Sequence, residues 1–399
     1  MWHFFSPNIV YGEDALNYLE NIKGKKCFIV TDKIIEELGY LKILTDKLDQ
    51  FERDYIVFDE IEPDPKEESA LKGKEKCNSY EPNLIIALGG GSVMDTAKAI
   101  WAMYEYPKYT ITNIDPFNEE LYDFANKAKM IAIPTTSGTG SETTWAVVIS
   151  QFENNVWRKA SLSHTSLVPT FAIVDPIFPK GMPPKLTVNT AFDALAHSIE
   201  GYASGWRNEF SSALGLKAIE LIFKYLPIAY KDGNNMEARD YMHQAATMAG
   251  LSFGNSQCHL GHAMGHSWSA IYHTPHGQSI GLFLRYITQY VLYTEEESNE
   301  SIEIYSDMAK KLGWANWDEK PKKAASKVVD KIKEIQEKVD FITNLKDLGV
   351  DRENFEGNLT KLVSLCFQDP SSVMAPRIPN KEDFIKIYKY AYEGKDVDF

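Results

Sequence analysis

Side chains that bind metal ions gather at tight spacings in the second half of this chain. Asp193 and His197 stand four residues apart in the segment FDALAHSIE. His262 and His266 repeat that spacing in GHAMGHSWSAIYHTPHG, which ends close to His276. On a helix, side chains four residues apart project from one face, so each pair can close on a single divalent cation. A catalytic metal is therefore the first hypothesis.

The ligand chemistry narrows the choice of metal. One carboxylate with two or three neutral imidazoles suits Fe(II) or Zn(II), and the lack of cysteine ligands argues against a closed structural zinc site. An isolated pair such as Asp193 and His197 is more often an ordinary helix hydrogen bond, so the second cluster carries the hypothesis. His259 and His273 each precede a stronger candidate by three residues. We expect both to lie beside the metal or in solvent, because one cation has room for few side chains.

A glycine-rich segment, LIIALGGGSVMDTAKAI, lies between an apolar run and a helix-patterned run. Gly89, Gly90 and Gly91 let the backbone approach a phosphate closely. The helix start that follows offers unpaired N–H groups and a positive dipole end to a pyrophosphate. For GGGS alone, a tight strand-to-helix turn is an equally good interpretation.

Asp32 ends the first strand-like run, in CFIVTDK. A carboxylate there can accept hydrogen bonds from the adenosine ribose and repel a 2′-phosphate, which favours NAD over NADP. The alternative is that Asp32 is only the N-cap of the next helix. Because the acid precedes the glycines and GGGS is not GxGxxG, the pattern indicates a dinucleotide fold other than the standard Rossmann fold.

A second polar loop, IPTTSGTGSETTWAVV, follows the apolar run at 130–134. Its hydroxyl groups can bind phosphate or ribose oxygens. A cluster of serine, threonine and glycine is by itself most often only a loop, and that interpretation stays open.

The elements that must position these residues divide the chain in two. Short apolar runs alternate with helix-patterned segments in the first part, which predicts a parallel sheet with helices on both faces. From about Leu186 onward long amphipathic runs predict an all-helical second part. The segment PKGMPPK at 179–185 suits a boundary, so we expect domains at 1–182 and 183–399. The expected strands are 27–31, 55–58, 84–88, 130–134 and 171–175; the expected helices include 34–48, 67–77, 213–230 and 324–337.

Composition excludes several classes of protein. The chain has 399 residues, 44% hydrophobic and 25% charged, which is ordinary globular usage and long enough for two cores. Its formal net charge of −14 argues against nucleic acid or an anionic membrane as a partner. Four scattered cysteines without CxxC spacing predict free thiols in a reducing compartment. With no leader-like start and no transmembrane run, we expect a cytoplasmic protein.

Taken in order, the motifs VTDK, GGGSVMDTAK, IPTTSGTGSE, FDALAHSIE and HAMGHSWSAIYHTPHG resemble those of the iron-containing (group III) alcohol dehydrogenases. That family includes lactaldehyde reductase, 1,3-propanediol dehydrogenase and butanol dehydrogenases. The resemblance runs from FFSPNIVYG to about Leu282 and more weakly to the end. It implies a dehydroquinate synthase-like fold: an α/β N-terminal dinucleotide-binding domain, an all-α C-terminal domain with the metal, and an active site in the cleft between them.

The resemblance also implies roles for single residues. His266 matches a histidine that lies beside the metal without binding it, which makes it the candidate catalytic residue for proton relay. The metal ligands implied are Asp193, His197, His262 and His276. The cofactor residues implied are Asp32 and Asp64 near the adenosine, and Gly89, Gly90, Gly91, Ser92, Asp95, Thr135, Thr136, Thr139, Thr144 and Lys159 around the phosphates, ribose and nicotinamide.

Three departures from the family pattern leave every ligand in place. Ala191 stands where glycine is usual, Asp64 replaces an asparagine in PDP, and Ala375 begins a segment that is usually NPR. The extra negative charge of Asp64 strengthens the prediction of NAD over NADP.

The activity implied is the interconversion of a primary alcohol and its aldehyde by hydride transfer with NAD(H), at one divalent metal, Fe2+ in preference to Zn2+. The resemblance also suggests a homodimer or larger homo-oligomer. Trp145, Ala146 and Phe253 match positions of the substrate pocket, and Trp268 follows closely after His266. An aromatic lining favours an apolar substrate, although these rings can equally belong to the core.

Two other functions stay open. A metal- and NAD-dependent lyase of the dehydroquinate synthase type shares the fold, but it needs a pocket rich in Lys, Arg and Asn, whereas Trp, Phe, Ala and Met lie near these ligands. A sensor that kept the site but lost turnover is the non-enzymatic alternative. Reduction of short aldehydes by NADH after Fe(II) loading separates the first function from both.

Overall fold

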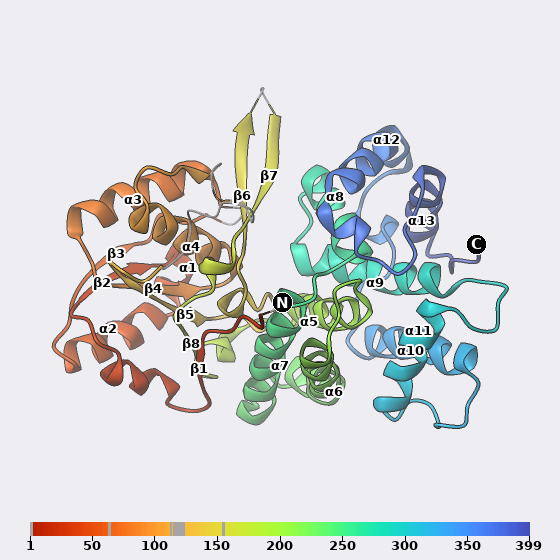
Figure 1. The fold of residues 1–399 in the computed structure, drawn as a ribbon, viewed down its shortest axis with the longest axis horizontal. Helices are drawn as coiled ribbons and strands as arrows, with labels where there is room; N and C mark the ends of the chain where they lie inside the picture. The colour runs from red at the N-terminus through yellow and green to blue at the C-terminus, as the bar shows by residue number, and fades with distance from the viewer. Residues whose placement is uncertain (1–2, 63–64, 112–113, 115–123, 154–155) are drawn as a thin grey trace. The chain divides into compact units, whose positions relative to one another are not determined.

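The computed structural model describes the chain except residues 1–2, 63–64, 112–113, 115–123 and 154–155, with backbone only for the rest of 152–162. The chain forms two compact units, Met1–Met182 and Pro183–Phe399 (Figure 1). Asp64, one of the predicted cofactor residues, lies outside the described residues.

A six-stranded sheet forms the centre of the first unit. Every neighbouring pair of strands is parallel, and the order is β1-β8-β5-β4-β2-β3. All residues of the central strand β4 are buried, as expected for a strand that helices cover on both faces. The predicted parallel sheet is confirmed. The strands are β1 (Asn8–Tyr11), β2 (Lys26–Val30), β3 (Asp54–Phe58), β4 (Leu84–Gly89), β5 (Lys129–Pro134) and β8 (Phe171–Val174).

Helices cover the two faces of this sheet, and alternate residues of β4 point into different cores. Leu84, Ile86 and Leu88 pack with the helix α2. Ile85 and Ala87 pack with α3 and α4 on the opposite face. The helices of this unit are α1 (Lys33–Glu37), α2 (Tyr40–Gln50), α3 (Glu67–Tyr80) and α4 (Gly91–Glu105).

Two local features differ from the sequence-based expectation. The single helix expected at 34–48 is broken into α1 and α2, because Gly39 adopts a left-handed conformation with φ of 78° between them. An antiparallel hairpin of β6 (Ala146–Glu153) and β7 (Val156–Ser163) was not predicted. Both deviations lie outside the main sheet.

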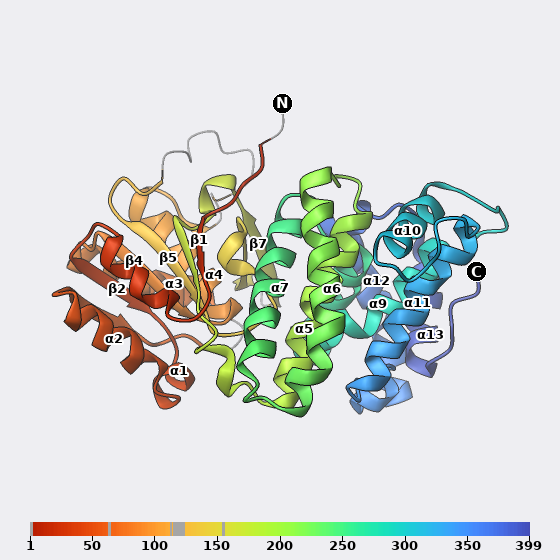
Figure 2. The same cartoon turned by 90° about the horizontal axis from the view of Figure 1, so that it is seen from below.

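The second unit, all of which the structure describes, consists of helices without a strand, so the predicted helical half is confirmed. The helices α5, α6 and α7 pack side by side (Figure 2). Among the described residues no helix combines the length and apolar character needed to cross a bilayer. The helices are α5 (Pro184–Ala203), α6 (Glu209–Lys231), α7 (Met236–Gly254), α8 (Leu260–Tyr272), α9 (His276–Leu292), α10 (Glu300–Lys311), α11 (Pro321–Lys338), α12 (Arg352–Gln368) and α13 (Lys381–Glu393).

Glycines allow α5, α8 and α9 to approach one another closely. A Cβ on Gly277, in the first turn of α9, would lie 2.1 Å from the carbonyl oxygen of Asn189 on α5. A Cβ on Gly265 of α8 would lie 2.4 Å from the side chain of Ile280 on α9. Any larger residue at either position would push these helices apart. The three helices that carry the predicted metal ligands are therefore held at backbone contact distance.

Candidate metal centre and cofactor loop

Three of the predicted metal ligands converge on a carboxylate oxygen of the fourth, Asp193. Asp193 Oδ1 lies 3.7 Å from Nε2 of His197, 3.7 Å from Nε2 of His262 and 3.2 Å from Nε2 of His276. A tetrahedral cation with bonds of about 2.1 Å separates its ligand atoms by about 3.4 Å. The distances to Asp193 therefore fit a cation bound beside this carboxylate. The ligand atoms of Asp193, His262 and His276 all lie within 4.8 Å of one another, and His197 falls in a second such group with His262 and Cys258.

The burial of these atoms is a second test of the fit. Asp193, His197 and His262 are buried, and neither Asp193 Oδ1 nor His262 Nε2 has a hydrogen-bond partner among the described residues. Buried polar atoms without partners are costly and therefore rare. A cation bound between them would satisfy both. The side chain of His276 is 43% exposed, so the cluster is open to a small molecule on that side.

The electrostatics favour the protonation states that a metal requires. Burial, the largest effect, lowers the pKa of His197 and of His262 to about 3, although Asp193 acts to raise both. Burial acts to raise the pKa of Asp193, but the neighbouring imidazoles outweigh it and hold that pKa below its ordinary value. Near neutral pH Asp193 is therefore a carboxylate, and His197 and His262 are neutral imidazoles, which is the ligating form of each.

His266 does not join this cluster. Its Nδ1 lies 2.7 Å from Oδ2 of Asp369, and its ring stacks on that of His276 with centroids 5.2 Å apart. Burial acts to raise the pKa of Asp369, yet the charge and hydrogen bond of His266 outweigh it and lower that pKa to about 2. The i,i+4 pair of α8 is thus divided: His262 faces Asp193, whereas His266 forms a pair with a carboxylate.

The spacing in the sequence made His266 a candidate metal ligand, but it is His276 whose Nε2 lies close to Asp193. His276 is the first residue of α9, directly after Pro275. His273 ends α8 in a left-handed conformation and is exposed.

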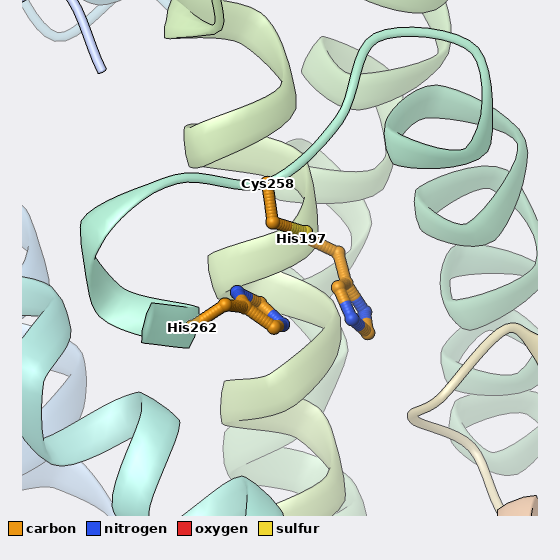
Figure 3. A group of neighbouring side chains, drawn as sticks. All are labelled: His197, Cys258 and His262. Atoms are coloured by element: carbon orange, nitrogen blue, oxygen red, sulfur yellow. The ribbon is translucent and has the colours of Figure 1, made fainter. Parts of the chain in front are cut away.

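Two further buried side chains adjoin the ligands. Glu200 Oε2 accepts a hydrogen bond from the main-chain N–H of His259 (2.7 Å) and lies 3.0 Å from His262 Nδ1. Cys258 has its sulfur within 4.8 Å of ring nitrogens of His197 and His262, and Figure 3 shows these three side chains gathered between α5 and the loop before α8. Burial raises the pKa of the Cys258 thiol well above its ordinary value. All four cysteines are free and buried.

Sequence reasoning missed Glu200, Cys258 and Asp369. A signal for Glu200 was present, because it lies seven residues after Asp193 and so on the same face of α5. Asp369 stands 103 residues from its partner His266, and no local pattern connects them.

The residues predicted to line a substrate pocket divide between the two units. Phe253 stacks on the ring of His197, with centroids 4.0 Å apart and planes at 13°. Trp268 is fully buried, and its indole N–H donates to Thr274 Oγ1. Trp268 thus belongs to the helical core, the alternative that the sequence left open. Trp145 and Ala146, at the start of β6, are partly exposed.

The glycine segment forms the turn from β4 into α4. Gly89 ends β4, Gly90 precedes the helix and Gly91 is its first residue. A Cβ on Gly91 would lie 3.1 Å from the side chain of Thr139, so the glycines pack directly against the hydroxyl-rich loop. No side chain caps the start of α4. Its first N–H groups are therefore available to an anion.

The other predicted cofactor residues surround this turn or lie beside it. Asp32 caps α1 by accepting from the N–H of Ile35 (2.9 Å), the structural role that the sequence left open for it. Lys159 pairs with Ser150 in the hairpin, and its side chain is not described. Thr135 and Thr144 are buried; Ser92, Asp95, Thr136 and Thr139 are partly exposed.

A buried lysine joins α4 to the hydroxyl-rich loop. Lys98 Nζ donates to Ser141 Oγ (3.0 Å) and to the carbonyl oxygens of Thr144 (2.8 Å) and Ala146 (3.1 Å). Asp95 accepts from the hydroxyl of Ser141 and from the N–H of Val148, both at 2.9 Å. Through these two hydrogen bonds Asp95 fixes the conformation of the loop.

Replacing Lys98 by methionine is expected to lower the free energy of unfolding by about 1–3 kcal/mol, because buried carbonyl groups lose their donor. Chemical denaturation measures the change. Lys76→Met is the matched control, since Lys76 is an exposed lysine paired with Glu60 and such pairs contribute about 0–1 kcal/mol. Equal losses in the two variants would contradict the role given to Lys98.

The same lysine predicts a pH dependence. Burial lowers the pKa of Lys98 to about 8 from an ordinary value of 10.5, although Asp95 and Glu142 act to raise it. Between these values the unfolded chain holds a proton at Lys98 that the folded chain has released, so stability rises with pH. The free energy of unfolding of the wild type should therefore rise relative to that of Lys98→Met as the pH increases above about 8. A difference that falls over this interval would refute the prediction.

Comparison with known proteins identifies relatives of both units. The sequence model described as iron-containing alcohol dehydrogenase matches residues 6–176, and the one described as Fe-containing alcohol dehydrogenase family, C-terminal, matches residues 187–392. The NADPH-dependent butanol dehydrogenase of Clostridium saccharobutylicum is 34% identical, with all of both chains covered. Aldehyde-alcohol dehydrogenase 2 of Entamoeba histolytica is 32% identical over 98% of this chain, which spans only 46% of that protein.

The structural comparison agrees. The iron-containing alcohol dehydrogenase of Thermococcus thioreducens superposes with a TM-score of 0.87 at 29% identity, covering 99% of this chain and 100% of that one. The fold is thus the dehydroquinate synthase-like fold that such structures share. The predicted class of reaction, NAD(P)-dependent interconversion of alcohol and aldehyde, is confirmed, and the lyase alternative is not favoured. The chain belongs to the iron-containing alcohol dehydrogenase family.

Proposed function

We propose that this protein interconverts a primary alcohol and its aldehyde with NAD(H), at a divalent metal held by Asp193, His197, His262 and His276. One observation carries the proposal: three imidazole nitrogens from α5, α8 and α9 lie 3.2–3.7 Å from a single buried carboxylate oxygen. A bound cation supplies Lewis acidity, which lowers the pKa of an alcohol or polarises a carbonyl group. The mixed nitrogen and oxygen ligand set suits Fe2+ or Zn2+, and the match to the iron-containing family supports Fe2+.

We assign the transfer of the proton to and from the reacting oxygen to His266. Its Nδ1–H donates to Asp369, which leaves Nε2 able to exchange a proton with the reacting oxygen or with solvent. The side chain of His266 is 31% exposed, so it has access to water, while Asp369 is largely covered. Asp369 thus fixes the tautomer of His266 and stabilises its protonated form.

The cofactor is assigned to the turn between β4 and α4. The main-chain N–H groups of Gly91 and Ser92, at the uncapped start of α4, would bind the pyrophosphate. The partly exposed hydroxyls of Thr136 and Thr139 would bind phosphate or ribose oxygens. The nicotinamide supplies or accepts the hydride, and the protein supplies alignment and charge. Asp95 accepts hydrogen bonds from the loop and so positions the hydroxyl groups that would bind the cofactor.

NAD(H) is expected to be preferred to NADP(H), because Asp32 places a carboxylate two residues after the end of β2 and Asp64 adds a second negative charge. The related butanol dehydrogenase of C. saccharobutylicum is NADPH-dependent by name, so this preference would distinguish the two proteins. Asp32→Ser keeps a capping oxygen for α1 but removes the charge. We expect this variant to reduce the preference for NADH roughly tenfold, the equivalent of about 1.4 kcal/mol.

Ratios of kcat/KM with NADH and NADPH measure this effect. Asp46→Ser is the matched control, because Asp46 is an exposed carboxylate on α2 that pairs with Lys42. Its ratio should equal that of the wild type. A wild type that uses NADPH as well as or better than NADH would overturn the assignment.

The substrate is proposed to be a small apolar primary alcohol or aldehyde. Phe253 covers one face of the ligand His197, and an aromatic wall beside a metal favours apolar groups. Trp145 and Ala146, both partly exposed, are retained as pocket residues. Trp268 is not, because it is buried in the core.

The test is direct. The protein is purified without oxygen, its metal is measured, and the metal-free form is reloaded with Fe2+ or Zn2+ before assay on a panel of alcohols and aldehydes. We expect metal-dependent turnover of short alcohols, fastest with Fe2+. Stoichiometric metal binding without turnover of any alcohol or aldehyde would favour a sensor. We further propose that the protein is cytoplasmic, which the free thiols support. A homodimer or larger assembly is proposed from the family resemblance alone.

A further inference from the structure

Glu200 lies behind the metal cluster and has no part in the mechanism above. It is on α5, seven residues after Asp193, and its side chain is fully buried. We propose that Glu200 is a positioning residue that fixes the tautomer of His262 and the start of α8, and so sets the affinity of the centre for its metal. This inference rests on the metal centre proposed above.

The tautomer follows from the donor and acceptor roles. A carboxylate only accepts hydrogen bonds, and a neutral imidazole carries one N–H. Since Glu200 Oε2 lies 3.0 Å from Nδ1 of His262, the proton of that ring is on Nδ1. Its Nε2 then has a free lone pair. This is the nitrogen that lacks a hydrogen-bond partner and lies 3.7 Å from Asp193 Oδ1.

The same carboxylate oxygen also anchors the backbone. It accepts from the N–H of His259 at 2.7 Å, and His259 is the residue directly before α8. The ring of His259 in turn accepts from the N–H of Leu260 at 2.8 Å. One oxygen on α5 thus holds both the ligand ring and the start of the helix that carries it.

The approach of Glu200 to α8 depends on Gly261. A Cβ at that position would lie 2.0 Å from Glu200 Oε1. Glycine is therefore the residue that lets this carboxylate reach the helix backbone.

The charge of Glu200 supports the same role. Glu200 Oε1 has no hydrogen-bond partner among the described residues, and a buried carboxylate without full compensation is costly. A cation bound to His262 Nε2 would provide that compensation. A carboxylate that accepts from the second nitrogen of a ligand imidazole also raises the basicity of that ligand, and loss of such a partner typically costs roughly 10–100-fold in metal affinity.

Glu200→Gln separates orientation from charge, because the amide oxygen can still accept from His259 and His262. Glu200→Ala removes both the hydrogen-bond acceptor and the negative charge. Glu105→Gln is the matched control, since Glu105 is a buried carboxylate in the other unit that accepts from the main-chain N–H groups of Lys127 and Ala128. Competition with a chelator on the metal-free full-length chain gives the affinities for Fe2+ and Zn2+. We expect roughly tenfold weaker binding for Glu200→Gln and up to about 100-fold for Glu200→Ala.

Nitrogen NMR of the zinc-loaded protein reports the tautomer separately. A protonated Nδ1 on His262 that is retained in Glu200→Gln and lost in Glu200→Ala supports the proposal; an Nδ1 without a proton in the wild type overturns it. Folded Glu200 variants that bind metal as tightly as the wild type, or an equal loss in Glu105→Gln, also overturn it. If Glu200→Ala does not fold, Glu200→Gln decides the question. A wild type that binds no metal would instead refute the centre itself.

Discussion

Replacing His262 by alanine is expected to abolish both metal binding and alcohol dehydrogenase activity. His262 contributes a buried Nε2 without a hydrogen-bond partner, 3.7 Å from Asp193 Oδ1. Its removal leaves three ligands and a cavity beside a buried carboxylate. The loss of affinity should exceed the roughly 10–100-fold that is typical of a residue that only orients a ligand.

Metal analysis after purification under Fe2+ measures this prediction, together with turnover of a short alcohol. His273→Asn is the matched control from the same segment: His273 is exposed and left-handed at the end of α8, a conformation that asparagine accepts. It should retain metal and activity. A full complement of metal in His262→Ala would remove His262 from the ligand set.

His266→Gln is expected to lower kcat by roughly 10²–10⁴-fold, the usual contribution of a positioned acid or base, while the metal content stays that of the wild type. The reason is geometric, because His266 turns its Nδ1 to Asp369 and is not among the groups of ligand atoms that lie close together in the described chain. Asp369→Asn should lower kcat by less. It removes the charge that orients the ring but leaves the imidazole.

Steady-state kinetics and metal analysis separate the two histidines of α8. A loss of kcat with metal retained supports proton transfer by His266, whereas a loss of metal would make it a ligand. Gln244→Ala is a suitable control in the same unit, because Gln244 donates to Asp240 on its own helix. Unchanged kcat in His266→Gln would contradict the assignment of the proton to this residue.

The local sequence was sufficient to predict the repeating parts of the fold. Alternating apolar runs predicted the parallel sheet, since a central strand such as β4 is buried on both faces. Amphipathic runs predicted α6 and α11 within a few residues. The break at Gly39 was missed because a single left-handed residue interrupts a helix pattern without changing its apolar period. The β6–β7 hairpin is local in sequence, and it was missed because the polar loop assigned after the strand at 130–134 already included the first residues of β6.

For the site, the sequence alone determined which residues carry ligand chemistry and which of them share a helix face, because a spacing of four residues is a local property of a helix. Only the tertiary structure decided which of these ligand atoms lie close together. Close packing at Gly265 and Gly277 brings α8 and α9 together with α5, so that His276 joins the cluster. Asp369 turns His266 away from it, across 103 residues of chain. Such contacts depend on how helices pack, and packing is set by the whole core and not by any one segment.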